Sequence, residues 1–507
     1  MSTLPALHPA LGDNPAFSNP AQVDWPAPAL LHLPEKILQF GTGTFLRSFA
    51  DYFIDRANRQ GMFGGRIVMV GSTDSRRGQR LNEQGGLYTL RVQGLEEGAA
   101  VERYTVVSSV SRALSAKEDW DAVLAVARDP NLELVISNTT EVGIAYDPED
   151  TPGPYAPRSF PGKLTACLYE RARHHNYNAE AGLVVLPCEL TERNGATLKG
   201  IVTQLAADWN LGVLFTDWLD AHVHFCDTLV DRISPGIPEG EVKDQVEMKL
   251  GYTDALLTSA EVYRLWPIQA SGAALPGLSF AEADPGIVLT DDITPFRERK
   301  VRILNGAHTI SVPLAFFAGE ETVLGMMNNP STSRFVEGVM HREIVPSLDV
   351  SGGAGFANEV LDRFRNPFLQ HRLLDITLQM TSKMRMRILP SLRRYYEKSG
   401  TLPDRILKGF AAYLWFMRVV EQDGSSFRGL HNGQWYPIRD DQAAYFATLW
   451  ANVDASDASQ IRALVGTVLA HAAFWGEDLN RFPDMADAIA GHLSMLAQAG
   501  ANALLEE

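Results

Sequence analysis

The first half of the chain alternates short apolar runs with helical patterns, and this alternation limits the fold more than any other feature. Four runs have the length and composition of buried strands: residues 37–40, 66–70, 132–137 and 183–186. Apolar residues at helical spacing lie between them, most clearly over residues 45–59. Strands separated by helices pair in parallel, because each crossover carries a helix over the sheet. We therefore predict a parallel sheet with helices on both faces, and an inserted hairpin formed by residues 87–92 and 101–107.

From about residue 295 onward, the alternation of strand and helix patterns ends. Long helical patterns dominate there: residues 300–317, 333–344, 356–364, 371–386, 406–422, 440–451, 459–472 and 485–498. The predicted organisation is an irregular N-terminal arm over 1–33, an α/β domain over 34–294 and an all-α domain over 295–507.

Composition limits the classes of partner. The chain has 507 residues and a formal net charge of −16, which argues against nucleic acid or an anionic membrane, since both attract basic surfaces. A small anionic substrate remains compatible with this charge if a local basic cluster binds it.

The cysteines and the N-terminus indicate the cellular location. Three cysteines without a CxxC pair, and an N-terminus without a signal-peptide pattern, predict a cytoplasmic protein. No apolar run reaches the length of a membrane span. Oligomeric state has no signature in the sequence.

A glycine pair follows the first predicted strand and opens the first helix. The residues are Gly41, Thr42, Gly43, Thr44 and Phe45. At such a turn, backbone amides at the start of a helix can face the pyrophosphate of a dinucleotide. The usual third glycine is absent, because Leu occupies position 46. A tight turn without a ligand is the alternative interpretation.

Two further segments follow predicted strands and can contact a dinucleotide. Asp74 lies past the second strand, where an acid binds an adenosine ribose and favours NAD, although Arg76 and Arg77 could accept the 2′-phosphate of NADP. We expect NAD. A short polar segment after the third strand suits a nicotinamide ribose or substrate hydroxyls, and turn formation explains it equally well. Its candidate residues are Asn138, Thr139, Thr140 and Glu141.

The start of the helical half places an amine, an amide and an imidazole in an apolar run. They belong to Lys300, Asn305 and His308. In an α-helix of about 100° per residue, Asn305 lies roughly 140° and His308 roughly 80° around from Lys300, so one wall of a cleft can present all three. A lysine in a dry cleft can act as a base near neutral pH, and the other two groups can bind a carbonyl oxygen. A helix with an exposed lysine, a capping asparagine and a packed histidine is the alternative.

Other reactive side chains carry weaker signals. Cys188 has no histidine nearby to activate it, so a buried core role is favoured. His222 and His224 lack a third ligand at a metal-binding spacing, and no metal site is predicted. A group of basic residues in the second half could bind a carboxylate or could form a solvated face. It comprises Arg363, Arg365, Lys383, Arg385 and Arg387.

Taken together, these segments resemble the mannitol dehydrogenase family, the polyol-specific long-chain dehydrogenases. The resemblance covers nearly the whole chain from about residue 37. The segments that carry it are residues 40–47, 137–141, 186–190, 225–233, 300–308 and 363–367. It implies a Rossmann-type NAD-binding domain followed by an all-α domain, with the active site between them and no catalytic metal.

The resemblance also implies roles for individual residues. Lys300 would be the general acid/base, Asn305 would stabilise the oxyanion and His308 would orient the substrate. It further implies that Glu189 and Asp231 contact the substrate, and that Arg363, Lys383 and Arg385 receive a carboxylate.

Two departures from the mannitol-type pattern point to the substrate. Leu190 stands where mannitol-type members carry a second oxyanion asparagine, and Arg297 replaces a proton-relay glutamate. Both fit the uronate branch, so the expected reaction is reversible hydride transfer between a nicotinamide and a keto-uronate. A sibling specificity for another keto-uronate or for a polyol is the nearest alternative. A nucleotide-binding regulator without turnover, or a hydrolase using a metal on His222 and His224, is more remote.

Overall fold

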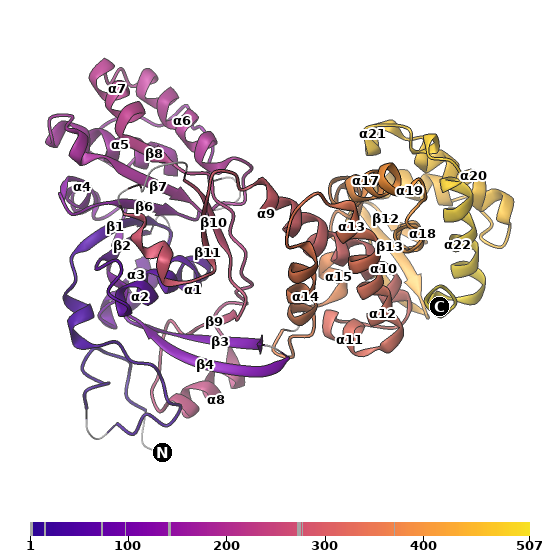
Figure 1. The fold of residues 1–507 in the computed structure, drawn as a ribbon, viewed down its shortest axis with the longest axis horizontal. Helices are drawn as coiled ribbons and strands as arrows, with labels where there is room; N and C mark the ends of the chain where they lie inside the picture. The colour runs from indigo at the N-terminus through magenta and orange to yellow at the C-terminus, as the bar shows by residue number, and fades with distance from the viewer. Residues whose placement is uncertain are drawn as a thin grey trace. The chain divides into compact units, whose positions relative to one another are not determined.

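The computed structural model describes residues 4–14, 17–71, 75–96, 98–139, 143–270, 275, 277–369 and 371–506. The predicted site residues Asp74, Thr140 and Glu141 lie outside the described residues. The chain forms two compact units, Met1–Ile293 and Thr294–Glu507, which Figure 1 shows in indigo to pink and in red to yellow.

A six-stranded sheet forms the centre of the first unit, in the order β5-β2-β1-β6-β7-β8. Its strands are β1 (Glu35–Phe40), β2 (Arg66–Gly71), β5 (Val110–Ser115), β6 (Leu134–Ser137), β7 (Leu183–Pro187) and β8 (Val223–Phe225). Every pairing in it is parallel, which confirms the predicted sheet. Counted along the chain, these strands have the order 3-2-1-4-5-6, so the direction of winding reverses between β1 and β6. In such sheets, ligands bind beyond the carboxyl ends of the strands at this reversal.

Helices cover both faces of the sheet because its strands are apolar on both sides. Ile37 of β1 packs into a core with α2, whereas Leu38 and Phe40 pack into a second core with α4 to α7 (Figure 1). The helices of this unit are α1 (Thr44–Ser48), α2 (Ala50–Arg59), α3 (Ser75–Glu83), α4 (Trp120–Arg128), α5 (Phe160–His174), α6 (Asn194–Asp208), α7 (Val213–His222) and α8 (Gly240–Leu250). The helix predicted over 45–59 is interrupted at Phe49, where the backbone leaves helical geometry (φ −123°, ψ −86°).

The predicted inserted hairpin is present as β3 (Tyr88–Glu96) and β4 (Ala99–Val107), which pair antiparallel. On the other side of β3 lies β9 (Thr258–Glu261), paired in parallel. A further parallel pair is formed by β10 (Trp266–Gln269) and β11 (Ile287–Thr290). The N-terminal arm packs onto the hairpin and α8 through Leu7, Leu11 and Val23, so the arm is part of the hydrophobic core of this unit.

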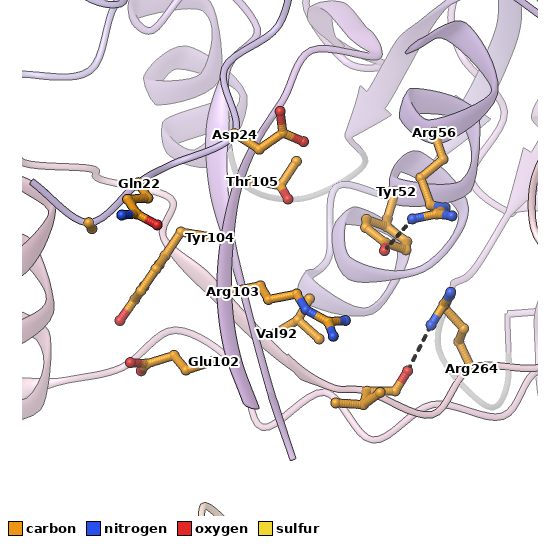
Figure 2. Close-up of a pocket in the computed structure, with 12 residues that line it drawn as sticks. Gln22, Asp24, Tyr52, Arg56, Val92, Glu102, Arg103, Tyr104, Thr105 and Arg264 are labelled. Atoms are coloured by element: carbon orange, nitrogen blue, oxygen red, sulfur yellow. Dashed lines mark hydrogen bonds between the residues drawn. The ribbon is translucent and has the colours of Figure 1, made fainter. Parts of the chain in front are cut away.

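A hollow of about 390 Å³ lies between the arm, α2 and the hairpin. Figure 2 shows Arg103 on one side of β4 and Tyr104 on the other, as the alternation of a strand requires. The arginines lining the hollow already bind carboxylates of the same unit: Arg56 and Arg264 both contact Asp284 at 2.8 Å. Their charge therefore stabilises the packing of α2 against the segment that contains Asp284.

The second unit is predominantly helical, with a small antiparallel sheet that the sequence did not predict. Its α-helices are α9 (Thr294–Arg299), α10 (Ala307–Phe317), α11 (Val323–Asn328), α12 (Pro330–Gly338), α13 (Val345–Ser347), α14 (Gly353–Phe364), α15 (Leu373–Ile376), α16 (Met380–Lys383), α17 (Leu389–Ser399), α18 (Asp404–Phe416), α19 (Ala443–Trp450), α20 (Ala458–Leu469), α21 (Ala472–Trp475), α22 (Met485–Ala499) and α23 (Ala501–Leu505). The sheet consists of β12 (Glu421–Asp423), β13 (Ser426–His431) and β14 (Gln434–Pro437). Within the described residues, no helix has the length and apolar character needed to cross a membrane.

Three segments of the second unit are π-helical and pack together. They are η4 (Lys300–Gly306), η5 (Val339–Ile344) and η6 (Met384–Ile388), with η4 in contact with both others. The helix predicted over 371–386 is also interrupted, because Gln379 takes a left-handed conformation between α15 and α16. π-helical turns are rare in proteins, and those that occur are often found at functional sites.

The helix that follows η4 is fixed by close packing on α18. A Cβ atom at Gly409 of α18 would lie 2.5 Å from the carbonyl oxygen of Ile310 in α10, so the two backbones approach each other at a distance that only glycine permits. Nearly every residue of α10 is buried, including His308. This packing gives the end of the candidate catalytic segment a fixed position.

Candidate functional site

The glycine turn after β1 has the geometry expected of a dinucleotide site. Gly41 has φ +123°, and a Cβ atom there would lie 2.7 Å from the carbonyl oxygen of Asn138. Gly43 precedes α1 and offers its first amides no side-chain acceptor, and a Cβ atom at Gly43 would meet nothing within 4 Å. The first glycine therefore makes the turn, and the second leaves open space beside the backbone. Thr42, Thr44 and Phe45 lie in the same turn, half-buried.

The polar segment after β6 lies against this turn and is held by β7. Asn138 donates its backbone N–H to the carbonyl of Phe40 (3.1 Å) and its side-chain amide to the carbonyl of Cys188 (2.6 Å). Thr139 donates both its backbone N–H and its hydroxyl to the Glu189 carboxylate, each at 3.0 Å. The structure thus brings Gly41, Asn138, Thr139 and Glu189 together at the reversal between β1 and β6.

The remaining candidates after β7 and β8 differ in exposure. Cys188 is fully buried, and burial raises the pKa of its thiol well above the usual value, so it stays protonated and is not a nucleophile. Leu190 is 70% exposed at the carboxyl end of β7. Asp231 is buried, and its backbone pairs with Leu265.

Three arginines of α3 line a second cavity of this unit, of about 250 Å³. They are Arg76, Arg77 and Arg80, and Ile237 and Leu256 complete the lining. α3 follows β2 along the chain, and in such folds the adenosine is bound near the end of this strand. The sequence analysis named Arg76 and Arg77 as residues that could accept the 2′-phosphate of NADP, but it did not name Arg80.

In the second unit, the π-helical form of η4 changes the predicted arrangement of the catalytic candidates. Lys300 begins η4 and Asn305 lies near its end, both half-buried. A π-helix closes its hydrogen bonds between residues i and i+5, so Asn305 follows Lys300 by about one turn. The 140° separation of an α-helix therefore does not apply, and the two residues lie on nearly the same face of η4.

His308 is buried one residue into α10 and is held by aromatic contacts. Its ring stacks on Phe364 with the ring centroids 3.9 Å apart, and it meets His371 edge-on at 5.4 Å. Burial lowers the pKa of His308 well below its usual value, and the positive charges around it act in the same direction. The imidazole is therefore neutral at pH 7. Its Nε2 atom has no hydrogen-bond partner among the residues that the structure describes, which leaves a polar atom for a ligand to bind.

Besides His371, three basic side chains lower the pKa of His308 through their charge. They are Arg363, Arg387 and Lys383. Burial, and then the charge of Arg387, lower the pKa of Lys383 to about 8, and its ammonium donates to the carbonyl of Ile376 at 2.8 Å. Arg385, in contrast, is exposed and lies next to Gly476, and it is not among the charges with the largest effect on the pKa of His308.

Arg387 belongs to the basic group that the sequence analysis described, but it was not among the residues expected to receive the carboxylate. It lies four residues after Lys383 and donates to the Thr309 hydroxyl (3.3 Å), which itself donates to the carbonyl of Asn305 (2.8 Å). Its helical spacing from Lys383 was the available signal, because residues four apart share a face.

His222 ends α7 and His224 lies in β8. Among the described residues, no group of three or more His, Cys, Asp and Glu side chains is arranged to hold a metal ion.

Comparison with protein families matches both units of the chain. The mannitol dehydrogenase Rossmann domain matches residues 35–278, and the mannitol dehydrogenase C-terminal domain matches residues 292–497. The altronate oxidoreductase of Yersinia enterocolitica is 41% identical over 93% of this chain and 96% of its own length. That of Bacillus subtilis is 38% identical over 94% and 95%.

Solved structures agree on the fold. Mannitol 2-dehydrogenase from Pseudomonas fluorescens, in a ternary complex with NAD and D-mannitol, has a TM-score of 0.67 at 23% identity and covers 99% of both chains. A substrate-free D-sorbitol dehydrogenase has a TM-score of 0.79 at 20% identity, covering 99% of this chain and 100% of its own.

Proposed function

Because the chain belongs to the mannitol dehydrogenase family, we propose that it is an NAD-dependent tagaturonate reductase, which interconverts tagaturonate and altronate. The observation that carries this proposal is the match to altronate oxidoreductases at 38–41% identity along nearly the whole chain. The substrate assignment also rests on Leu190 and Arg297, which replace two residues of the mannitol-type pattern.

The first unit supplies what a dinucleotide needs. The open space beside Gly43 and the positive φ of Gly41 allow a pyrophosphate to approach the backbone, so the residues present fit NAD. When bound, the nicotinamide supplies or accepts the hydride. Thr42, Thr44, Phe45, Asn138 and Thr139 would line its binding site, and Asp74, Thr140 and Glu141 remain candidates from the sequence.

The second unit supplies the proton and the oxyanion ligands. Lys300 gives its proton to the forming alkoxide during reduction and removes the hydroxyl proton during oxidation. Asn305, one π-turn away on nearly the same face, donates a hydrogen bond to the same oxygen, and such a donor is worth about 3–4 kcal/mol to a developing oxyanion. Neutral His308 binds a substrate hydroxyl through its unpaired Nε2, which fixes the sugar relative to Lys300.

The cationic cluster around His308 suits the carboxylate that distinguishes a keto-uronate from a polyol. Arg363, Lys383 and Arg387 bring positive charge to one place in a chain of net charge −16. Arg385 is the weakest of the candidates named from the sequence, because it is exposed and apart from this group. Glu189 and Asp231 remain candidate substrate contacts from the first unit.

The activity test is direct. When the purified protein is mixed with NADH and tagaturonate, the absorbance of NADH should fall at about the rate that a typical enzyme gives. Lys300→Ala should abolish this fall while NADH still binds. Fructuronate, fructose and mannitol with NAD or NADH form the specificity panel, and NADPH tests the cofactor. Activity on another member of the panel but not on tagaturonate moves the enzyme to a sibling specificity. Tight NADH binding without turnover of any substrate would instead mean a regulator.

We also propose that the protein is cytoplasmic. Its three cysteines, Cys167, Cys188 and Cys226, are free and buried, which is typical of proteins in the reducing cytoplasm.

A further inference from the structure

Glu189 is 4% exposed just beyond the end of β7, and both oxygens of its carboxylate accept hydrogen bonds from residues at the end of β6 and directly after it. Oε1 accepts the N–H and the hydroxyl of Thr139, and Oε2 accepts the hydroxyl of Ser137, all at 3.0 Å. We propose that Glu189 is a positioning residue for the nicotinamide half of the cofactor, and that its negative charge favours NAD⁺ over NADH. This inference rests on the proposed use of a nicotinamide cofactor.

The segment that Glu189 binds, residues 137–139, contacts both the glycine turn and the residues after β7. Its middle residue, Asn138, touches the glycine turn so closely that Gly41 has no room for a side chain, and it also binds the carbonyl of Cys188. The segment therefore lies between β1 and β7, at the reversal of the winding. In a doubly wound sheet, the second half of the strands receives one nucleotide of the dinucleotide. Moving residues 137–139 would change the surface on which that nucleotide lies.

A carboxylate suits this position better than an amide does. Three donors converge on two oxygens, and an ionised carboxylate accepts all of them without offering a donor of its own. Burial nevertheless raises the pKa of Glu189, while hydrogen bonds from Thr139, from Ser137 and from its own backbone act in the opposite direction. An ionised carboxylate at this depth is expected to have a positively charged partner in the functional complex.

The nicotinamide ring provides a reason for the charge. The ring is positively charged in NAD⁺ and neutral in NADH, so a buried carboxylate at this edge stabilises the oxidised form selectively. In a protein interior of effective dielectric constant about 20, one such interaction is worth on the order of a tenfold difference in affinity. The ratio of the dissociation constants of NAD⁺ and NADH therefore reports on the charge, whereas the two absolute values report on the shape of the segment.

Two substitutions separate charge from shape. Glu189→Gln removes the charge, while its amide oxygen can still accept from Thr139 and its NH₂ can donate to the Ser137 oxygen. We expect NADH to bind nearly as in the parent protein and NAD⁺ to bind about tenfold more weakly. Glu189→Ala removes the hydrogen bonds as well, and both forms should bind more weakly. Glu192→Gln, at an exposed acid in the same loop, is the matched control and should leave the ratio unchanged.

The measurement is titration of the full-length protein with each cofactor form, by calorimetry and by nicotinamide fluorescence, without a sugar substrate. An unchanged ratio in Glu189→Gln overturns the charge role, and unchanged affinities in Glu189→Ala overturn the positioning role. If Glu189→Ala does not fold, Thr139→Val tests positioning by removing one donor and should weaken both forms by a smaller factor. A protein that shows the expected ratio but does not reduce tagaturonate would overturn the proposed substrate and leave this inference standing.

Discussion

Replacing Gly41 by alanine should damage both the stability and the cofactor site of the first unit, for reasons that Gly43 does not share. At φ +123° a side chain strains the backbone by about 1–3 kcal/mol. Its Cβ atom would also lie 2.7 Å from the carbonyl oxygen of Asn138, so the segment held by Glu189 would have to move. For a unit of this size, that energy corresponds to a fall in melting temperature of about 2–6 °C.

The control is Gly43→Ala. Gly43 has φ −67°, which any residue adopts, and a Cβ atom there meets nothing within 4 Å. This variant should melt as the parent protein does, and it should bind NADH more weakly because the methyl group fills the space left for the pyrophosphate. Thermal unfolding followed by circular dichroism, together with NADH titration, measures both effects. Equal melting temperatures for the two variants would refute this explanation of the glycine turn.

Four further outcomes follow from the second unit. Asn305→Ala should lower kcat by about 10²–10³ and change KM little, because the amide acts on the developing oxyanion; a loss confined to KM would contradict this. Arg387→Ala should raise KM for tagaturonate by more than tenfold, whereas Arg385→Ala should leave it unchanged, and equal effects in steady-state kinetics would remove Arg387 from the carboxylate site. KM should rise above pH 8, where Lys383 loses its proton, and Lys383→Met should abolish this rise in a pH profile. Burial raises the pKa of Glu343 to about 7, so the folded chain holds a proton that the unfolded chain has already lost above about pH 4.5. The free energy of unfolding should therefore fall as pH rises from about 4.5 to 7. Urea unfolding of Glu343→Gln should show a shallower fall than the parent protein does.

The architecture of the first unit was predictable because its strands are apolar and separated by helical patterns. β1, β2, β6 and β7 coincide with the four predicted runs, and the inserted hairpin also lies where the pattern placed it. The short strand β8 was missed because three residues carry almost no periodic signal. β12 was missed because all its residues are exposed, so nothing in their polarity marks a strand.

The candidate site was predictable in its residue types and less so in its geometry. Lys300, Asn305 and His308 stand out as polar groups in an apolar run, but nothing in the local sequence marks the π-helical form of η4, which packs against η5 and η6. The choice of Arg385 over Arg387 has a different origin. Both are basic residues of η6, and the four-residue spacing from Lys383, which favours Arg387, was not used.

The π-helical start of the candidate catalytic segment makes the position of its lysine depend on how the backbone winds. A π turn holds one more residue than the α turn that replaces it. If η4 wound as an α-helix with all its residues kept, Lys300 and Asn305 would lie about 140° apart instead of on nearly the same face. Removing one residue between them would allow the same α-helical winding with the two side chains about 400° apart, which is again about one turn. A single deletion here should therefore preserve the alignment of the proton donor, whereas loss of the π-helical form without a deletion should move the lysine out of place.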